Sequence, residues 1–227
     1  MQTPRDAQQK RRNLFLTTLI LFILFSINLF AQQEDTLLSK ETSSNIDEIN
    51  QAINFCPGGI IFGIYAINYE YLVNQKHGLV PRFDYEMVSE TLSDDTMEAN
   101  GYAFTFNYRY HFSGGMESYY VGSYVRYKLY EGNATDGATK FDFTLHEYTL
   151  GLNAGKRWVW SSGININAAF GYGISKLEKE MDPTSPSIEA KLDKFIDEYD
   201  FIGPFYGEIS IGYAFWLETI RNLEIPN

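Results

Sequence analysis

The sequence predicts an all-β chain: an eight-stranded, antiparallel, up-and-down transmembrane β-barrel with long extracellular loops, the last of which contains a short helix. Three observations predict this fold. A secretory leader begins the chain, apolar and polar residues alternate with period two along most of it, and short connections alternate with long ones. Transmembrane barrels show this pattern because one face of each strand meets lipid and the other meets a polar interior.

The leader is typical of exported proteins. Four basic residues precede an apolar run from Leu14 to Phe30, which ends at the small residue Ala31. This order predicts a cleaved signal peptide over residues 1–31. An uncleaved anchor helix remains the alternative, because the run approaches the length that spans a bilayer. Residues 32–49 are mostly polar and predict a loose periplasmic lead-in.

Composition excludes nucleic acid as a partner. The 227 residues carry 18 Lys and Arg against 29 Asp and Glu, a net charge of −11, whereas neutralising phosphates requires basic surface. Without residues 1–31 the count is 14 against 28, or −14. Cys56 is the only cysteine, so no internal disulfide forms. We expect Cys56 to be a small buried side chain.

Alternation begins at residue 50, and successive side chains of a strand point to opposite faces. Strands are expected over residues 50–56, 61–73 and 77–88, with a tight turn at residues 57–59. The next two strands form the clearest hairpin, over residues 101–112 and 119–130. Its first strand places aromatic side chains on one face and small or polar ones on the other: Tyr102, Phe104, Phe106, Tyr108, Tyr110 and Phe112 against Ala103, Thr105, Asn107, Arg109 and His111.

The sixth strand, expected over residues 141–160, changes parity. Its first apolar residues (Phe141, Phe143, Leu145) and its later ones (Tyr148, Leu150, Leu152, Trp158) fall on opposite faces. A β-bulge near residues 146–147 would absorb this slip. Alternatively, the first part projects beyond the bilayer as a hairpin arm, where lipid no longer constrains parity.

The last strands are expected over residues 163–176 and 205–216, so that the barrel spans residues 50–216. Between them, Ser185-Pro186 predicts a helix start. The apolar face of this helix is a candidate interaction surface; alternatively, the helix lids the barrel mouth or packs on neighbouring loops. This face comprises Ile188, Leu192, Phe195, Ile196 and Tyr199. Residues 217–227 form a tail.

The connections divide into two classes. Those at residues 74–76, 113–118 and 161–162 are short, and those at residues 89–100, 131–140 and 177–204 are long. Since the classes alternate, the short turns lie on one side, as periplasmic turns do opposite extracellular loops. The tight turn at residues 57–59 is the exception.

Aromatic residues cluster beside these short turns and at the end of the last strand. We expect them to form a membrane-interface girdle, although in a soluble barrel they would be core residues. The girdle comprises Tyr69, Tyr71, Tyr110, Phe112, Tyr119, Trp158, Trp160, Phe215 and Trp216.

Charged residues on the opposite parity are expected to face the lumen. An eight-stranded barrel is only wide enough for its own side chains, so these charges must pair. A closed lumen is therefore predicted, with a gated ion or proton path as the alternative. The network comprises Glu70, Arg82, Asp84, Glu86, Arg109, Arg126, Lys128, Glu147, Arg157 and Glu208.

Catalytic signals are weak. His111 and Ser113, with Glu117 nearby, have a spacing similar to the His-x-Ser of outer-membrane lipid A deacylases, and nucleophilic catalysis needs such groups within hydrogen-bond reach. However, parity turns His111 inward at the periplasmic side, away from lipid A. His77 and His146 are isolated, so no metal site and no cofactor is expected.

The stretch Gly63 to Asn74 reads Gly-Ile-Tyr-Ala-Ile-Asn-Tyr-Glu-Tyr-Leu-Val-Asn. With this stretch, the chain resembles small eight-stranded outer-membrane barrels of the OmpA and OmpX type. It most resembles a bacteroidete outer-membrane barrel family of unknown function, with an early glycine-led strand ending in a Tyr-Glu-Tyr motif. The resemblance covers about residues 50–216 and implies the fold and a Gram-negative outer-membrane location. Such barrels usually end on an aromatic residue, whereas here Leu217 to Asn227 follow Trp216.

The predicted function is that of a non-enzymatic outer-membrane barrel, serving envelope structure or surface interaction through its loops. Expected partners are outer-membrane lipid and lipopolysaccharide, the barrel-assembly machinery, and an extracellular protein or glycan. Three alternatives stay open. They are a soluble calyx-like barrel with apolar faces turned inward to bind a small apolar ligand, a narrow pore, and an outer-leaflet lipid-modifying enzyme.

Overall fold

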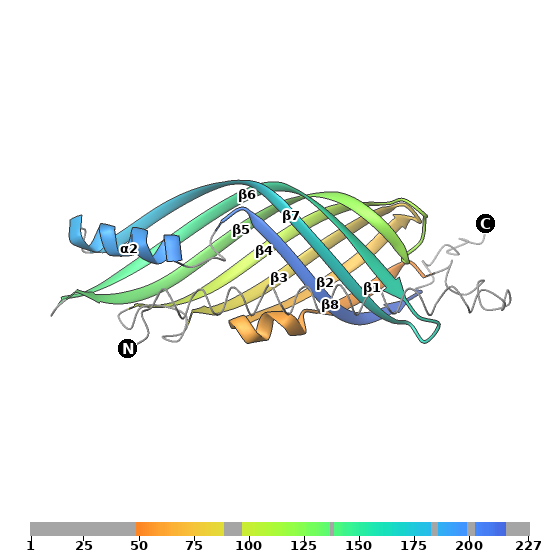
Figure 1. The fold of residues 1–227 in the computed structure, drawn as a ribbon, viewed down its shortest axis with the longest axis horizontal. Helices are drawn as coiled ribbons and strands as arrows, with labels where there is room; N and C mark the ends of the chain where they lie inside the picture. The colour runs from red at the N-terminus through yellow and green to blue at the C-terminus, as the bar shows by residue number, and fades with distance from the viewer. Residues whose placement is uncertain (1–48, 89–96, 137–138, 183–185, 199–202, 217–227) are drawn as a thin grey trace, which may run out of the picture. The chain divides into compact units, whose positions relative to one another are not determined.

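The computed structural model describes residues 49–88, 97–136, 139–182, 186–198 and 203–216. Within them, eight antiparallel strands close into one barrel in chain order, with the first paired to the last (Figure 1). The elements are β1 (Gln51–Phe55), η3 (Pro57–Phe62), β2 (Ile64–Asn74), β3 (His77–Val88), β4 (Met97–His111), β5 (Ser118–Asp136), β6 (Thr139–Val159), β7 (Ile164–Asp182), α2 (Pro186–Glu198) and β8 (Phe205–Phe215).

The predicted leader, most of the lead-in and the tail lie outside the described residues. In the part of the chain that the structure describes, no helix is both long and apolar enough to cross a bilayer.

Period two holds along the strands and assigns one face of each to the exterior. On β4, the side chain of Phe104 is 57% exposed, whereas Thr105 beside it is 3% exposed. Phe106 and Tyr108 continue the outer row, and Asn107 and Arg109 the buried one. β4 therefore carries its aromatic side chains outside and its polar ones inside.

The loop predicted at residues 131–140 is wrong. β5 runs to Asp136 and β6 starts at Thr139, and the two strands pair residue by residue up to that point. β4 likewise starts at Met97 and β7 continues to Asp182, so the other two long loops are shorter than predicted. Backbone pairing extends these strands through polar and small residues that were interpreted as loop, because a ladder needs only main-chain donors and acceptors.

The parity change in β6 is explained by a projecting hairpin arm, and the predicted β-bulge near residues 146–147 is wrong. The register of β6 against β5 and β7 shows no shift. Phe141, Phe143 and Leu145 therefore share the inward face with Glu147, and all four are buried. The extended ends of β5, β6 and β7 form a projecting sheet, here called the arm (Figure 1).

α2 packs against the inward face of the arm. Leu192 is fully buried in a cluster with Tyr130, Phe141, Phe143 and Leu145, and Ile196 packs against its edge. The predicted helix start at Ser185-Pro186 agrees with α2, which begins at Pro186. The apolar residues on the inward face of the arm are explained by their packing against this helix and not by contact with lipid.

The tight turn predicted at residues 57–59 is wrong as well. The chain forms the 3-10 helix η3, with Pro57 at its start and Gly63 at its end in the left-handed region, at a φ of 74°. Proline is pre-organised for the first turn of a helix, and glycine tolerates positive φ. β2 consequently starts at Ile64, three residues later than predicted.

This early end of β1 leaves a seam in the barrel wall. β1 pairs with β8 only as far as Phe55, which lies opposite Ile211. β8 continues to Phe205, so its residues 205–210 have no β1 partner in the described register. Main-chain groups along this edge must find other partners if lipid surrounds the barrel.

Candidate functional site

The lumen holds all ten of the predicted inward charges. Each of them makes at least one ion pair, and their side chains are at most 8% exposed. The pairs are Arg82–Asp84 at 2.7 Å, Arg82–Glu208 at 3.8 Å, Arg109–Glu70 and Arg109–Glu208 at 2.8 Å, Arg157–Glu70 at 2.7 Å, Arg126–Glu147 at 3.2 Å and Lys128–Glu86 at 2.9 Å.

Glu70 is the centre of the cluster nearest the short turns. Its Oε2 accepts from Nη1 of Arg109 at 2.8 Å and lies 2.7 Å from Nη2 of Arg157, while Oε1 lies 2.7 Å from Nε2 of His111. The guanidinium of Arg109 also lies 4.5 Å from the centre of the Tyr120 ring. One carboxylate thus balances two arginines that are wholly buried.

Glu208 is the centre of a second cluster in the middle of the barrel. Its Oε2 accepts from Nη2 of Arg109 and from the hydroxyl of Tyr206, at 2.8 and 2.5 Å. Its Oε1 accepts from Asn68, Asn167 and Ser210 at 2.6–2.9 Å. Because Arg109 bridges Glu70 and Glu208, the two clusters form one network that links β2, β4, β7 and β8 across the lumen.

A third cluster ties the chain before β8 into the barrel. Arg126 donates to the carbonyls of Gly203 at 2.5 Å and Phe205 at 2.8 Å. Glu147 accepts from the amide of Gly203 at 3.1 Å, and the hydroxyl of Tyr124 donates to the Pro204 carbonyl at 2.9 Å. Side chains from β5 and β6 therefore hold the start of β8, at the end opposite the short turns.

Two of the lumen arginines also donate hydrogen bonds to main-chain carbonyls at the seam. Arg82 Nη1 donates to the carbonyl of Gly207 at 3.2 Å, and Arg126 Nη1 donates to that of Phe205. Both carbonyls lie on the stretch of β8 that lacks a β1 partner. Guanidinium groups thus take the place of amides from the missing part of β1. Parity predicted the facing of Arg82 and Arg126, but the sequence holds no signal for these acceptors.

Arg82→Lys is expected to lower the free energy of unfolding by about 1.5–3 kcal/mol, the order expected for one hydrogen bond that involves a charged group. The lysine keeps a charge for Asp84 but lacks the second arm that reaches the Gly207 carbonyl. Urea titration of the refolded chain in detergent micelles measures this change. Lys176→Arg, at a 75% exposed side chain, is the matched control. Equal stability of Arg82→Lys and the native chain would contradict the role of Arg82 at the seam.

Apolar side chains cluster beyond the charges, toward each end of the strands. At the end with the short turns, Met116 of the β4–β5 turn is wholly buried, and Nη1 of Arg157 lies 2.7 Å from its sulfur. Ala52, Leu72, Val159 and Ala214 surround it. At the opposite end, α2 and the arm form the cluster around Leu192.

The candidate catalytic residues are not brought together. Nε2 of His111 is bonded to Glu70 inside the barrel, whereas Ser113 is exposed on the turn. Burial raises the pKa of the Glu117 carboxyl above its ordinary value, and Lys156 partly offsets this shift. Among the described residues, no group of His, Cys, Asp and Glu is placed to hold a metal ion.

Two of the five residues of the predicted interaction surface on α2 are covered, because Leu192 and Ile196 pack onto the arm. The side chains of Ile188 and Phe195 and the whole of Tyr199 lie outside what the structure describes. The exposed side of α2 is polar, and Lys179 of β7 pairs with its Asp193.

The nine residues of the predicted girdle lie beside the short turns and at the end of β8, and none of them is buried. Phe112, Tyr119, Trp160 and Trp216 are exposed, and Tyr69, Tyr71, Tyr110, Trp158 and Phe215 are half-buried. Lys156 stands among them, with its ammonium 4.5 Å from the Tyr119 ring centre and 5.4 Å from that of Trp158.

A second aromatic row, absent from the predicted site, lies toward the other end of the barrel. Its rings contact across neighbouring strands: Tyr65 with Tyr85 at 6.4 Å, Tyr85 with Tyr102 at 5.3 Å, and Tyr127 with Tyr148 at 5.2 Å. The sequence contains a signal for this second row. Tyr102 and Tyr110 lie on the same face of β4, eight residues apart, and Tyr148 and Trp158 lie on the same face of β6, ten residues apart. At the usual rise and tilt, this separates the two rows by about 20–25 Å.

A family model described as "Protein of unknown function (DUF3575)" matches residues 60–215. No curated protein matches the chain. Among solved structures, the chain is similar to CarO2 and CarO of Acinetobacter baumannii, each at 12% identity. The alignment with CarO2 covers 74% of this chain and 98% of that chain at a TM-score of 0.40, and the alignment with CarO covers 75% and 98% at 0.38.

Proposed function

The chain belongs to the DUF3575 family, whose function is unknown, and we propose that it is a non-enzymatic outer-membrane barrel with a closed lumen. In this role it serves envelope structure or surface contact through its arm and α2. The observation that carries the proposal is the band between the two aromatic rows, where outward side chains are apolar while ten charges lie inside.

The band has the chemistry that a bilayer requires. Its exposed residues come from all sides of the barrel and include Ile53, Ile67, Phe104, Val125, Leu150, Leu152, Phe170, Ile174 and Ile211. An apolar patch of this extent is rare on soluble monomers. Its height, about 20–25 Å, agrees with the apolar band of transmembrane barrels, which is flanked by aromatic residues on both sides. Closure of the sheet pairs main-chain groups between strands, and Arg82 and Arg126 bind two of the seam carbonyls, where lipid offers no partner.

A soluble calyx requires the opposite sidedness. Its apolar residues would line the interior and its charges would face water. Here Phe104 and Ile211 are 57% and 46% exposed, while Arg126 is 7% exposed. This arrangement argues for a lipid environment and against an apolar ligand in the lumen.

The membrane proposal predicts two linked results for the exported chain. The barrel should fractionate with the outer membrane, and unboiled samples should migrate differently from boiled ones on a denaturing gel, because a closed strand ladder resists detergent. Recovery of the mature chain from the soluble fraction, with mobility independent of heating, would contradict the proposal.

The closed lumen predicts the absence of stable, large single-channel steps in planar bilayers. The reason is that paired charges occupy the middle of the barrel, which is only wide enough for its own side chains, and the apolar cluster around Met116 lies at one end. A porin reconstituted in the same bilayers is the positive control. Reproducible large steps from the native chain would support a pore instead.

The partners follow from the same proposal. Outer-membrane lipid and lipopolysaccharide would surround the apolar band, and the barrel-assembly machinery would insert it. An extracellular protein or glycan would meet the outer side of the arm and the exposed side of α2, since Leu192 and Ile196 of α2 are already packed on the arm.

A further inference from the structure

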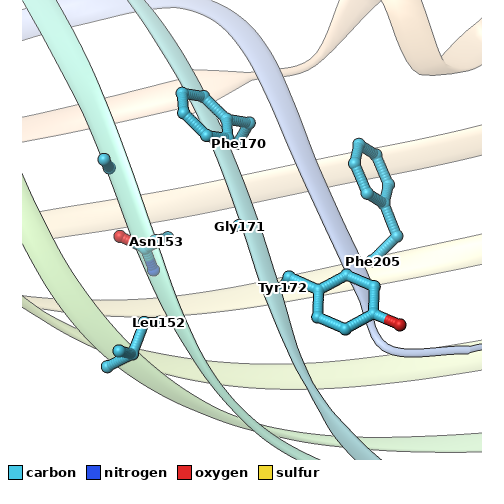
Figure 2. Close-up of a pocket in the computed structure, with 7 residues that line it drawn as sticks. Leu152, Asn153, Phe170, Gly171, Tyr172 and Phe205 are labelled. Atoms are coloured by element: carbon cyan, nitrogen blue, oxygen red, sulfur yellow. The ribbon is translucent and has the colours of Figure 1, made fainter.

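A shallow groove lies on the outer face of the barrel over β6, β7 and β8 (Figure 2). It is lined by Leu152, Ala154, Phe170, Tyr172 and Phe205, together with Asn153 and Gly171. The register explains the hollow. One row across the strands reads Ala154, Phe170 and Gly207, so a large ring stands between two small residues. The next row, Leu152, Tyr172 and Phe205, consists of large side chains and bounds the groove.

The rings that bound the groove face outward. Phe170 and Tyr172 are each 69% exposed, and Phe205 is 56% exposed. A Cβ added at Gly207 would lie 3.2 Å from the Phe205 ring, so the glycine leaves room for that ring to lie against the wall. An apolar groove flanked by exposed rings fits a flexible hydrocarbon chain.

A cation lies on the same outer face as the groove, nearer the arm. Lys176 of β7 pairs in register with Tyr148, a member of the second aromatic row, and its side chain is 75% exposed. Its ammonium bonds Glu178 at 2.6 Å. An ammonium has three donors, so a second acceptor can bind beside Glu178.

The distance between Lys176 and the groove matches the distance between the phosphate and the acyl chains of a lipid. The pair Tyr148 and Lys176 lies four residues from the pair Leu152 and Tyr172 along the strands. This is about 13 Å along the strand, or about 10 Å in depth at the usual tilt. A phosphate at the level of Lys176 therefore places acyl chains at the level of the groove.

We propose that this groove binds an acyl chain of a phosphate-bearing lipid of the outer leaflet, with the lipid phosphate held by Lys176. The proposal rests on the proposed membrane function and deepens it, since it selects one place on the wall and one chemistry of lipid. Residues on the rest of the band would meet lipid without regard to the head group.

Native mass spectrometry of the full mature chain, folded in detergent, tests this with two lipids that share their chains. Dipalmitoyl phosphatidic acid carries the phosphate, and dipalmitoylglycerol lacks it. Lys176→Gln is expected to weaken binding of phosphatidic acid about fivefold and to leave dipalmitoylglycerol unchanged. Ala154→Phe, which fills the groove, is expected to weaken both lipids about tenfold, the effect of roughly two lost methylene contacts.

Two matched controls define specificity. Lys140→Gln removes an exposed lysine of the arm. Ala168→Phe enlarges a different alanine, on β7, which pairs with Lys156. Neither is expected to change the binding of either lipid. If Ala154→Phe fails to fold, Ala154→Leu fills the groove with less bulk, and Lys176→Gln alters only an exposed side chain.

Unchanged binding in both Lys176→Gln and the groove-filling variant would overturn the proposal, and so would an equal loss in the controls. Heat-dependent mobility of each variant separates the two levels of inference. A chain that enters the membrane but shows no groove-dependent binding contradicts this proposal alone. A chain that never enters the membrane contradicts the proposed function as well.

Discussion

Glu70→Leu is expected to lower the free energy of unfolding by about 3–5 kcal/mol, the cost of removing one partner from a buried ion pair. Glu70 is the carboxylate that both Arg109 and Arg157 contact, and all three side chains are 0% exposed. Leucine would leave two guanidinium groups near each other with one fewer counter-charge. Arg109 would keep Glu208, whereas the ion pair of Arg157 would be lost.

Urea titration of the refolded chain in lipid vesicles, followed by tryptophan fluorescence, measures this loss. Glu178→Leu is the control, because Glu178 also pairs with a cation but is 47% exposed, and surface pairs contribute about 0–1 kcal/mol. The variant Glu70→Leu/Arg157→Leu should recover part of the stability, since it removes a charge that has lost its partner. A loss no larger for Glu70→Leu than for Glu178→Leu would contradict the bracing role of the network.

Leu152→Arg is expected to lower the free energy of folding into vesicles by about 2–4 kcal/mol, the cost of an arginine near the bilayer midplane on the lipid face of a barrel. Leu152 is 70% exposed and lies between Tyr148 and Trp158, the aromatic residues of its strand. In water, an arginine at so exposed a position would cost almost nothing. The size of the effect therefore reports the surrounding lipid.

A depth series on the same face of β6 supplies the control. Thr144→Arg lies on the arm, beyond Tyr148, and is expected to change stability by less than about 1 kcal/mol. Leu150→Arg should lie between the two. A flat profile, with all three variants as stable as the native chain, would place this face in water.

The facing of the charges could be predicted because period two leaves each strand only two faces. Once Phe104 and Phe106 are assigned to lipid, Arg109 has to point inward. The choice of partners could not be predicted in this way. Arg109 bonds Glu208 from 99 positions away, and which strands meet across the lumen depends on the stagger of the closed sheet.

The errors of the sequence analysis lie beyond the bilayer and at one short strand. Lipid enforces alternation only within the apolar band, so the ladder of β5 and β6 continues through Gly132 and Asn133 without an alternating pattern to mark it. Phe141 and Phe143 instead face inward because they pack in one cluster with Leu192 of α2. The same limit hid the early end of β1, where Pro57 starts η3 and leaves the seam that Arg82 and Arg126 serve.

The most direct test of the account is the environment of three outward positions spaced around the barrel. In a Cys56→Ala background, single cysteines replace Phe104 on β4, Leu152 on β6 and Ile211 on β8, and each carries a small fluorescent label in the refolded barrel. The account predicts that lipids with brominated acyl chains quench all three labels, while aqueous iodide does not. Quenching by iodide without quenching by the brominated lipids would mean that the apolar face meets water, and the membrane barrel would be contradicted.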